Sequence, residues 1–300
     1  MQLNELRKEL QFNGELTELI ETLKNIAAAQ YHMMEKEKQR FEEFMNAFSG
    51  FFRIVDLVKV DNPLVHEASE VLGIIIVTSD SGFMGGLNQG VIRAALRCQG
   101  ARGNSKTRLI VIGEKGATTF SDAHRKFKSF PGIDQERLYE HALEIRDYVV
   151  GEVLTGNIGR LMVVYPRPLS FTAQTIEVIS LLPCAALFDR EAESEVSRRT
   201  FGQEFLAEAR DVIVESSFSD MVEYLSGVWV ASKLYEIFED SKLAEFSARA
   251  MHLEESLQKL EKTQKKLRHQ CFKAAHEKID KGMRESFAAD KKRRRRHMAA

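Results

Sequence analysis

The stretch VLGIIIVTSDSGFMGGLNQGVIRAALR, residues 71–97, decides the fold class. Its apolar run ends at Val77, a glycine-rich turn follows, and apolar residues then recur at helical spacing. A continuous apolar run is typical of a strand that is buried on both faces in a parallel sheet covered by helices. The same strand–turn–helix unit can hold a nucleotide phosphate at the start of its helix. The turn therefore bears on whether the chain is a nucleotide-binding enzyme.

Strand and helix patterns continue to alternate through the middle of the chain. Residues 87–98 and 135–154 predict helices, and the expected strands lie at 108–113, 127–130, 160–166 and 171–183. Strands separated by helical segments predict a mainly parallel sheet. We therefore expect a central α/β domain of the Rossmann-like type over residues 70–188.

The two ends of the chain, residues 1–58 and 201–290, predict long helices. In each helix, apolar residues recur at alternating steps of four and three, which is the pattern of a coiled-coil seam. The expected seam residues are Leu16, Leu19, Leu23 and Ile26 in the first helix and Leu253, Leu257, Leu260 and Leu267 in the second. A compact domain between the two helices would bring together the helix ends attached to it. We therefore expect a long antiparallel coiled coil.

The last part of the second helix has a different apolar face, formed by Phe272, Ile279, Met283 and Phe287. The first helix is shorter than the second, so this face has no obvious partner within the chain.

The glycine-rich turn does not match the known phosphate-binding loops. Gly82, Gly85 and Gly86 are followed by Leu87 and Asn88, without the lysine that a Walker-type loop requires, and their spacing differs from the dinucleotide fingerprint. We expect these glycines to allow close contact between helix and sheet. Asp80 is expected to cap the turn, and no cofactor is expected.

Other patterns of catalysis and metal binding are also missing from the sequence. The eight histidines include no H-E-x-x-H pair, the three cysteines are far apart, and SDSG is not a hydrolase elbow. The longest apolar runs fall far short of the roughly 20 residues that cross a bilayer. We therefore expect no catalytic residue, no metal site and no membrane insertion.

The charge is unevenly distributed. The net charge of −1 includes six positive charges in KKRRRR, residues 291–296, so the rest of the chain sums to −7. A run of like charges without aromatic residues is typical of a solvated end, and we expect residues 291–300 to be a disordered basic tail. Two functional classes stay open at this point: a nucleotide-binding α/β enzyme, and a coiled-coil scaffold whose tail binds nucleic acid.

Several motifs together resemble the gamma subunit of F-type rotary ATP synthases. They occur in the family's order, from the N-terminus onward: LKNIAAAQ (23–30), SDSGFMGGLN (79–88), VIGEKG (111–116), QTIEVISLLP (174–183) and EFSARAMHLEESLQKLEK (245–262). The resemblance covers essentially the whole chain, including the helix–domain–helix layout.

The resemblance implies a non-catalytic rotor of the central stalk, which couples ion flow through the membrane sector to ATP synthesis or hydrolysis. Its implied partners are the alpha and beta subunits of the catalytic ring, the epsilon subunit and the membrane ring of c subunits, with no nucleic acid. Its implied place is the cytoplasmic face of a bacterial inner membrane, as a peripheral part of the complex. The implied contacts with the catalytic ring are Leu23, Ile26, Gln30, Phe272, Ile279, Met283 and Phe287.

The sequence departs from the family pattern at two places. Ser81 and Met84 stand where the family's turn motif usually has arginine and cysteine, so an ion pair made by that arginine is not expected here. The family's early helix is typically basic, whereas this one reads ELTELIETLK (15–24). Its charge toward a ring subunit is therefore altered.

Overall fold

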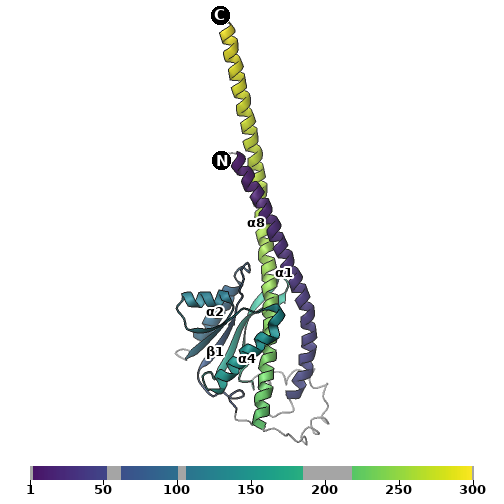
Figure 1. Ribbon diagram of the computed structural model, residues 1–300, viewed down its shortest axis with the longest axis vertical. Helices are drawn as coiled ribbons and strands as arrows, with labels where there is room; N and C mark the ends of the chain where they lie inside the picture. The colour runs from purple at the N-terminus through teal and green to yellow at the C-terminus, as the bar shows by residue number, and fades with distance from the viewer. Residues whose placement is uncertain (1–2, 53–61, 101–105, 185–217, 299–300) are drawn as a thin grey trace. The chain divides into compact units, whose positions relative to one another are not determined.

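A computed structural model describes residues 3–52, 62–100, 106–184 and 218–298 (Figure 1). The chain divides into two compact units. The first combines residues 1–26 with residues 250–300, and the second is residues 27–249. Helix α1 (Leu3–Phe52) and helix α8 (Phe218–Met298) each contribute residues to both units. The expectations for residues 53–58 and 201–217 lie outside the described ranges.

The second unit contains a five-stranded sheet with the order β3-β2-β1-β4-β5. The strands are β1 (Leu72–Val77), β2 (Thr107–Ile112), β3 (Phe127–Phe130), β4 (Arg160–Ser170) and β5 (Ala173–Leu182). Strands β1 to β4 pair in parallel, and β5 pairs antiparallel with β4. The predicted mainly parallel sheet is confirmed.

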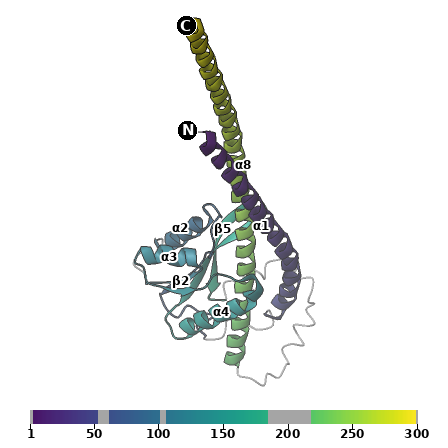
Figure 2. The same ribbon diagram turned by 45° about the horizontal axis from the view of Figure 1, so that its top comes forward.

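Both faces of the sheet are covered, which explains the continuous apolar run of β1. Ile74 and Ile76 pack in a cluster with residues of α2 (Leu87–Gly100) and α3 (Glu114–Asp122). Ile75 and Val77 pack in a second cluster with residues of α4 (Leu138–Leu154), α1 and α8. Figure 2 shows α2 and α3 together, away from α4. A one-turn 3₁₀ helix, η2 (Gln135–Arg137), precedes α4.

The helix α3 was not expected from the sequence. It has nine residues and includes a glycine and two threonines, which are weak helix formers. A hydrogen bond from another part of the chain supports its first turn: the Asp80 carboxylate accepts from the backbone N–H of Glu114 at 2.8 Å. Tertiary contact, rather than local propensity, defines this helix.

The basic end of the chain differs from the expectation. The backbone of residues 291–298 continues α8, where a disordered tail was predicted. Lysine and arginine are good helix formers, and no proline or glycine follows Gly282, so the helix has no local reason to end earlier.

The first unit is an antiparallel pair of helical segments. Lys24 on α1 forms an ion pair with Glu254 on α8 at 3.0 Å, and Gly14 lies near the Gln264 side chain. Ten residues forward along α1 correspond to ten residues backward along α8. The predicted antiparallel pairing is confirmed. Within the ranges given above, none of the helices combines the length and hydropathy that a bilayer span requires.

Candidate functional site

The seam residues expected on α8 lie on its inward side. Leu253 and Leu257 are buried, and Leu260 and Leu267 are half-buried. Charged residues between them, such as Glu255 and Lys259, are exposed and pair with each other at 2.7 Å. Burial therefore follows the same steps of four and three as the sequence pattern.

The seam on α1 lies one residue later than expected. Two of the expected seam residues, Leu19 and Ile26, are 56% and 51% exposed, whereas Leu16 and Leu23 are half-buried at the border of the contact. The residues that face inward in the first unit are Leu6, Leu10, Asn13, Thr17, Ile20 and Lys24, with steps of four and three. The sequence pattern predicts burial of the most apolar stripe of α1, but the stripe that packs against α8 includes polar residues.

This shift leaves an apolar stripe on the outside of the first unit. Phe12, Leu19 and Ile26 repeat every seven residues along α1, and all three are more than half exposed. Scattered exposed apolar residues are ordinary, but a regular row on one helix face is typical of a surface that contacts another protein. We call these three residues the α1 outer stripe.

The end of α8 carries a second exposed apolar surface. Phe272, Ile279, Met283 and Phe287 are between 52% and 76% exposed. Every residue from 276 to 289 is exposed, because the pairing register brings the first described residue of α1, Leu3, opposite Ala275. Of the other implied contacts, Gln30 is half-buried and lies in the second unit.

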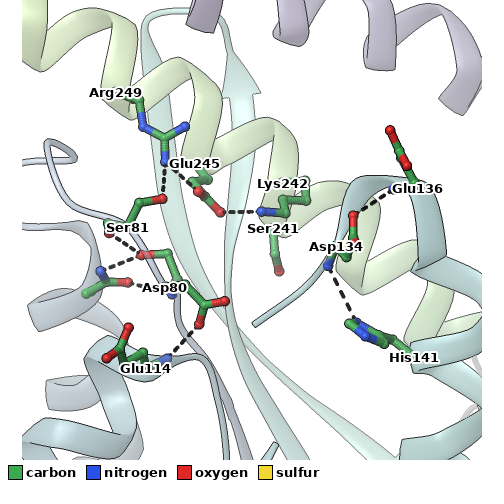
Figure 3. Close-up of polar contacts among 12 residues, drawn as sticks. Asp80, Ser81, Glu114, Asp134, Glu136, His141, Ser241, Lys242, Glu245 and Arg249 are labelled. Carbon is green, nitrogen blue, oxygen red and sulfur yellow. Dashed lines mark hydrogen bonds and ion pairs between the residues drawn. The ribbon is translucent and has the colours of Figure 1, made fainter. Parts of the chain in front are cut away.

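The turn after β1 is the place where a phosphate would be expected in a nucleotide-binding protein. Asp80 instead directs its carboxylate to the start of α3, as Figure 3 shows. Asn88 holds the end of the strand: its amide oxygen accepts from the backbone N–H of Ser79, and its amide nitrogen donates to the Ser79 hydroxyl. A carboxylate at a helix start fills the position that favours an anion, and Asp80 does so at α3, not at α2, the helix that follows this turn.

The glycines of this turn do not have the role expected for them. An added side chain at Gly82 or Gly86 would meet nothing within 4 Å, so neither position requires close contact between helix and sheet. Gly85 has a φ of 56°, which a residue with a side chain rarely adopts. Closer approach occurs at Gly132, where an added Cβ would clash with the Asp80 carboxyl group.

Sequence reasoning missed the residue of α8 that reaches this turn. Arg249 donates to the Ser81 hydroxyl at 2.9 Å and to the Glu245 carboxylate at 2.6 Å, and Glu245 also pairs with Lys242 (Figure 3). The turn that has serine at position 81 therefore receives an arginine contact from α8. The sequence gives no signal of this contact, because the two residues are 168 positions apart.

These features define an α/β protein with a doubly covered sheet, a turn after β1 whose Asp80 binds the start of α3, and a long helix pair with exposed apolar rows. The family model of ATP synthase matches residues 2–299. The chain belongs to this family, in which its curated relatives are gamma chains.

Individual relatives are distant but cover most of the chain. The ATP synthase gamma chain of Crocosphaera subtropica is 24% identical over 271 residues, covering 82% of this chain and 85% of the relative. The gamma chain of Desulforudis audaxviator is 28% identical over 202 residues, covering 65% of each. A chain in the cryo-EM structure of the Euglena gracilis mitochondrial ATP synthase, OSCP/F1/c-ring, has a TM-score of 0.66 at 17% identity, covering 96% of this chain and 93% of that one.

Proposed function

We propose that this chain is the central-stalk rotor of an ATP synthase and is itself non-catalytic. Its partners would be the alpha and beta subunits of the catalytic ring, the epsilon subunit and the c-subunit ring. It would lie at the cytoplasmic face of a bacterial inner membrane as a peripheral part of the complex. The observation that carries this proposal is the pair of exposed apolar surfaces on α1 and α8 in a chain of the ATP synthase family.

The contact with the catalytic ring would use both surfaces. The outer stripe supplies Ile26, with Leu23 at its border and Gln30 further along α1, and the end of α8 supplies Phe272, Ile279, Met283 and Phe287. The two surfaces differ in residue type and in spacing. A rotating shaft with unequal sides contacts the three catalytic sites differently, and such a difference is required if rotation is to change their affinities.

The charge of the outer stripe narrows the kind of ring surface that it fits. Glu9, Glu15 and Glu18 are exposed beside Phe12 and Leu19. A complementary partner would present apolar side chains edged by lysine or arginine. A family member with a basic early helix would instead fit an acidic ring surface, so the ring surface proposed here differs in charge.

The proposal is tested by producing the chain together with the alpha and beta subunits encoded in the same genome. We expect one assembly by size-exclusion chromatography with light scattering. The double variant Ile279→Ser/Phe287→Ser should weaken the association about tenfold or more, because hot spots in interfaces are buried apolar anchors. The matched control is Lys278→Ser, an exposed polar residue in the same turns of α8.

Two results would contradict the proposal. One is that the wild-type chain does not assemble with the ring subunits. The other is that the isolated chain turns over a nucleotide or binds ATP or NAD with micromolar affinity in a calorimetric titration, which would favour the enzyme alternative. Deleting residues 291–300 tests the nucleic-acid alternative, because a tail-dependent interaction would then be lost.

A further inference from the structure

A buried carboxylate of the second unit lies between cations from two other elements. Asp240 on α8 is 2% exposed. One of its oxygens accepts from the Lys38 ammonium group of α1, and the other lies 3.7 Å from Nε of Arg167 on β4. A single carboxylate thus contacts a helix and a sheet strand at once.

The contact with β4 is fixed by further hydrogen bonds. Nη1 of Arg167 donates to both carboxylate oxygens of Glu177 on β5, at 3.3 and 3.0 Å. The hydroxyl group of Tyr165, on β4 opposite Glu177, donates to the same carboxylate at 3.1 Å. The guanidinium group beside Asp240 is therefore held in place by two neighbouring strands. We call Lys38, Asp240, Arg167, Glu177 and Tyr165 the Asp240 network.

The Asp240 network is not expected to add much to the free energy of unfolding. Burial raises the pKa of Asp240, although the hydrogen bond from Lys38 and the charges of Lys38 and Arg167 act in the opposite direction. Desolvation, together with the smaller effect of the Glu236 charge, therefore outweighs the attraction of both cations. Buried ion pairs are often no better for stability than apolar residues of the same size, and their best-attested use is to fix one register between packed elements.

Apolar packing in the same region leaves the register of α8 less well defined. Leu234, Ile237, Phe238, Leu243 and Phe246 of α8 all belong to the large core cluster of the sheet. Contacts between such side chains are non-directional, so a helix can shift or turn slightly while it keeps its burial. The hydrogen-bonded pair of Asp240 with Lys38 is lost by a shift of about 1 Å, whereas the Arg167 contact at 3.7 Å is an ion pair beyond hydrogen-bond distance.

We propose that Asp240 is a positioning residue that holds α8 in one register against both α1 and β4. This inference rests on the proposed function: when the helices rotate, the Asp240 carboxylate transmits the rotation to the sheet, because α8 does not slide against β4. Two further hydrogen bonds join α8 to the sheet. The Gln174 side chain of β5 donates to the Ser247 hydroxyl, and Arg249 donates to the Ser81 hydroxyl in the turn after β1.

The decisive variant is Asp240→Asn, which keeps the size of the side chain and removes its charge. Lys38 and Arg167 are 19% and 47% exposed, so both cations can turn to water in the variant. The matched control is Ser241→Ala. Ser241 is the next residue and is 4% exposed, and its hydroxyl group donates to the Ile237 carbonyl of the same helix.

The first measurement uses the full isolated chain and does not depend on the proposed function. Spin labels at Glu223 on α8, paired with Lys36 on α1 or with Leu169 on β4, report the position of α8 against each element. All three residues are exposed, and Cys98 and Cys271 are replaced by alanine throughout. We expect Asp240→Asn to widen both distance distributions about twofold and Ser241→Ala to leave them unchanged. An unchanged width in Asp240→Asn overturns the inference. If that variant does not fold, as judged by circular dichroism, Lys38→Gln removes the α1 contact alone and is held to the same expectation.

The second measurement uses the assembled complex in proteoliposomes. We expect Asp240→Asn to keep ATP hydrolysis within about twofold of wild type and to pump about half as many ions per ATP, or fewer. Normal coupling together with a widened distance distribution overturns the role in coupling. If the distribution widens but the chain never assembles with ring subunits, the role of Asp240 in the register stands and the proposed function is contradicted.

Discussion

In the first unit, α1 and α8 show opposite relations between apolar sequence and burial. On α8 the most regular leucine row, from Leu253 onward, lies inside the pair. On α1 the most regular apolar row, Phe12, Leu19 and Ile26, lies outside it, and the inner row contains Asn13, Thr17 and Lys24. The difference shows that apolar periodicity alone does not tell which row of a helix is buried. Under the proposed function, the outer row of α1 would contact a partner.

The largest expected effect compares one leucine from each row. Leu253→Ala removes a side chain that is 1% exposed and should lower the free energy of unfolding by about 2–5 kcal/mol. Leu19→Ala removes an exposed side chain and should change it by no more than about 0.5 kcal/mol. Urea unfolding of both variants, followed by circular dichroism, measures the difference. Equal losses would show that the outer stripe is buried in solution.

The reverse effect is expected for binding. Phe12→Ser/Leu19→Ser should weaken association with the alpha and beta subunits about tenfold, or about 1.4 kcal/mol, while the melting temperature of the isolated chain stays close to that of wild type. Titration by surface plasmon resonance measures the affinity. The control is Gln11→Ser/Asn25→Ser, which changes exposed, uncharged polar residues on the same helix. Wild-type affinity in the apolar double variant would mean that the stripe has no partner in the ring.

A smaller effect tests the polar character of the inner row. Asn13 is 6% exposed, and its side-chain oxygen has no hydrogen-bond partner among the described residues. Asn13→Leu keeps nearly the same size and removes this buried polar group, so it should raise the free energy of unfolding by about 1 kcal/mol. A rise in melting temperature would agree with this reasoning. A fall would show that the amide is satisfied in solution.

The smallest effect concerns the ion pair between the two helices. The hydrogen bond from Lys24 lowers the pKa of Glu254, so the pair stabilises the folded state above the usual pKa of glutamate and is lost as the pH falls through the lowered value. Lys24→Met should therefore cost at most about 1 kcal/mol at pH 7, since both side chains are partly exposed, and progressively less below about pH 4. Thermal melting of wild type and variant from pH 3 to pH 7 measures this. A cost that grows in acid would contradict the assignment.

Much of the fold could be predicted from the sequence because its signals are local. The apolar run ending at Val77 predicts a doubly covered strand, and the steps of four and three predict two long paired helices. The helix α3 could not be predicted, because its first turn depends on a hydrogen bond from Asp80, 34 residues earlier. The role of the turn glycines was also missed, since a glycine motif does not reveal whether space, φ or neither requires the residue.

The candidate site was only partly visible in the sequence. The exposed face of Phe272, Ile279, Met283 and Phe287 followed from the unequal lengths of the helices. The sequence predicted burial for two residues of the outer stripe, Leu19 and Ile26, that are in fact exposed. Periodicity gives the angle between rows on a helix but not which row faces inward. Arg249 and the Asp240 network were missed altogether, since ion pairs between distant segments leave no pattern in a single sequence.

By itself, the sequence determined the two helices, their antiparallel pairing, the parallel sheet and the family, because each depends on periodicity or on motifs read along the chain. Only the tertiary structure decided which face of α1 is covered, what occupies the start of α3 and which charges meet around Asp240. These features depend on the angle at which one element meets another. A shift of one residue turns a helix by about 100° and replaces one row of side chains with the next.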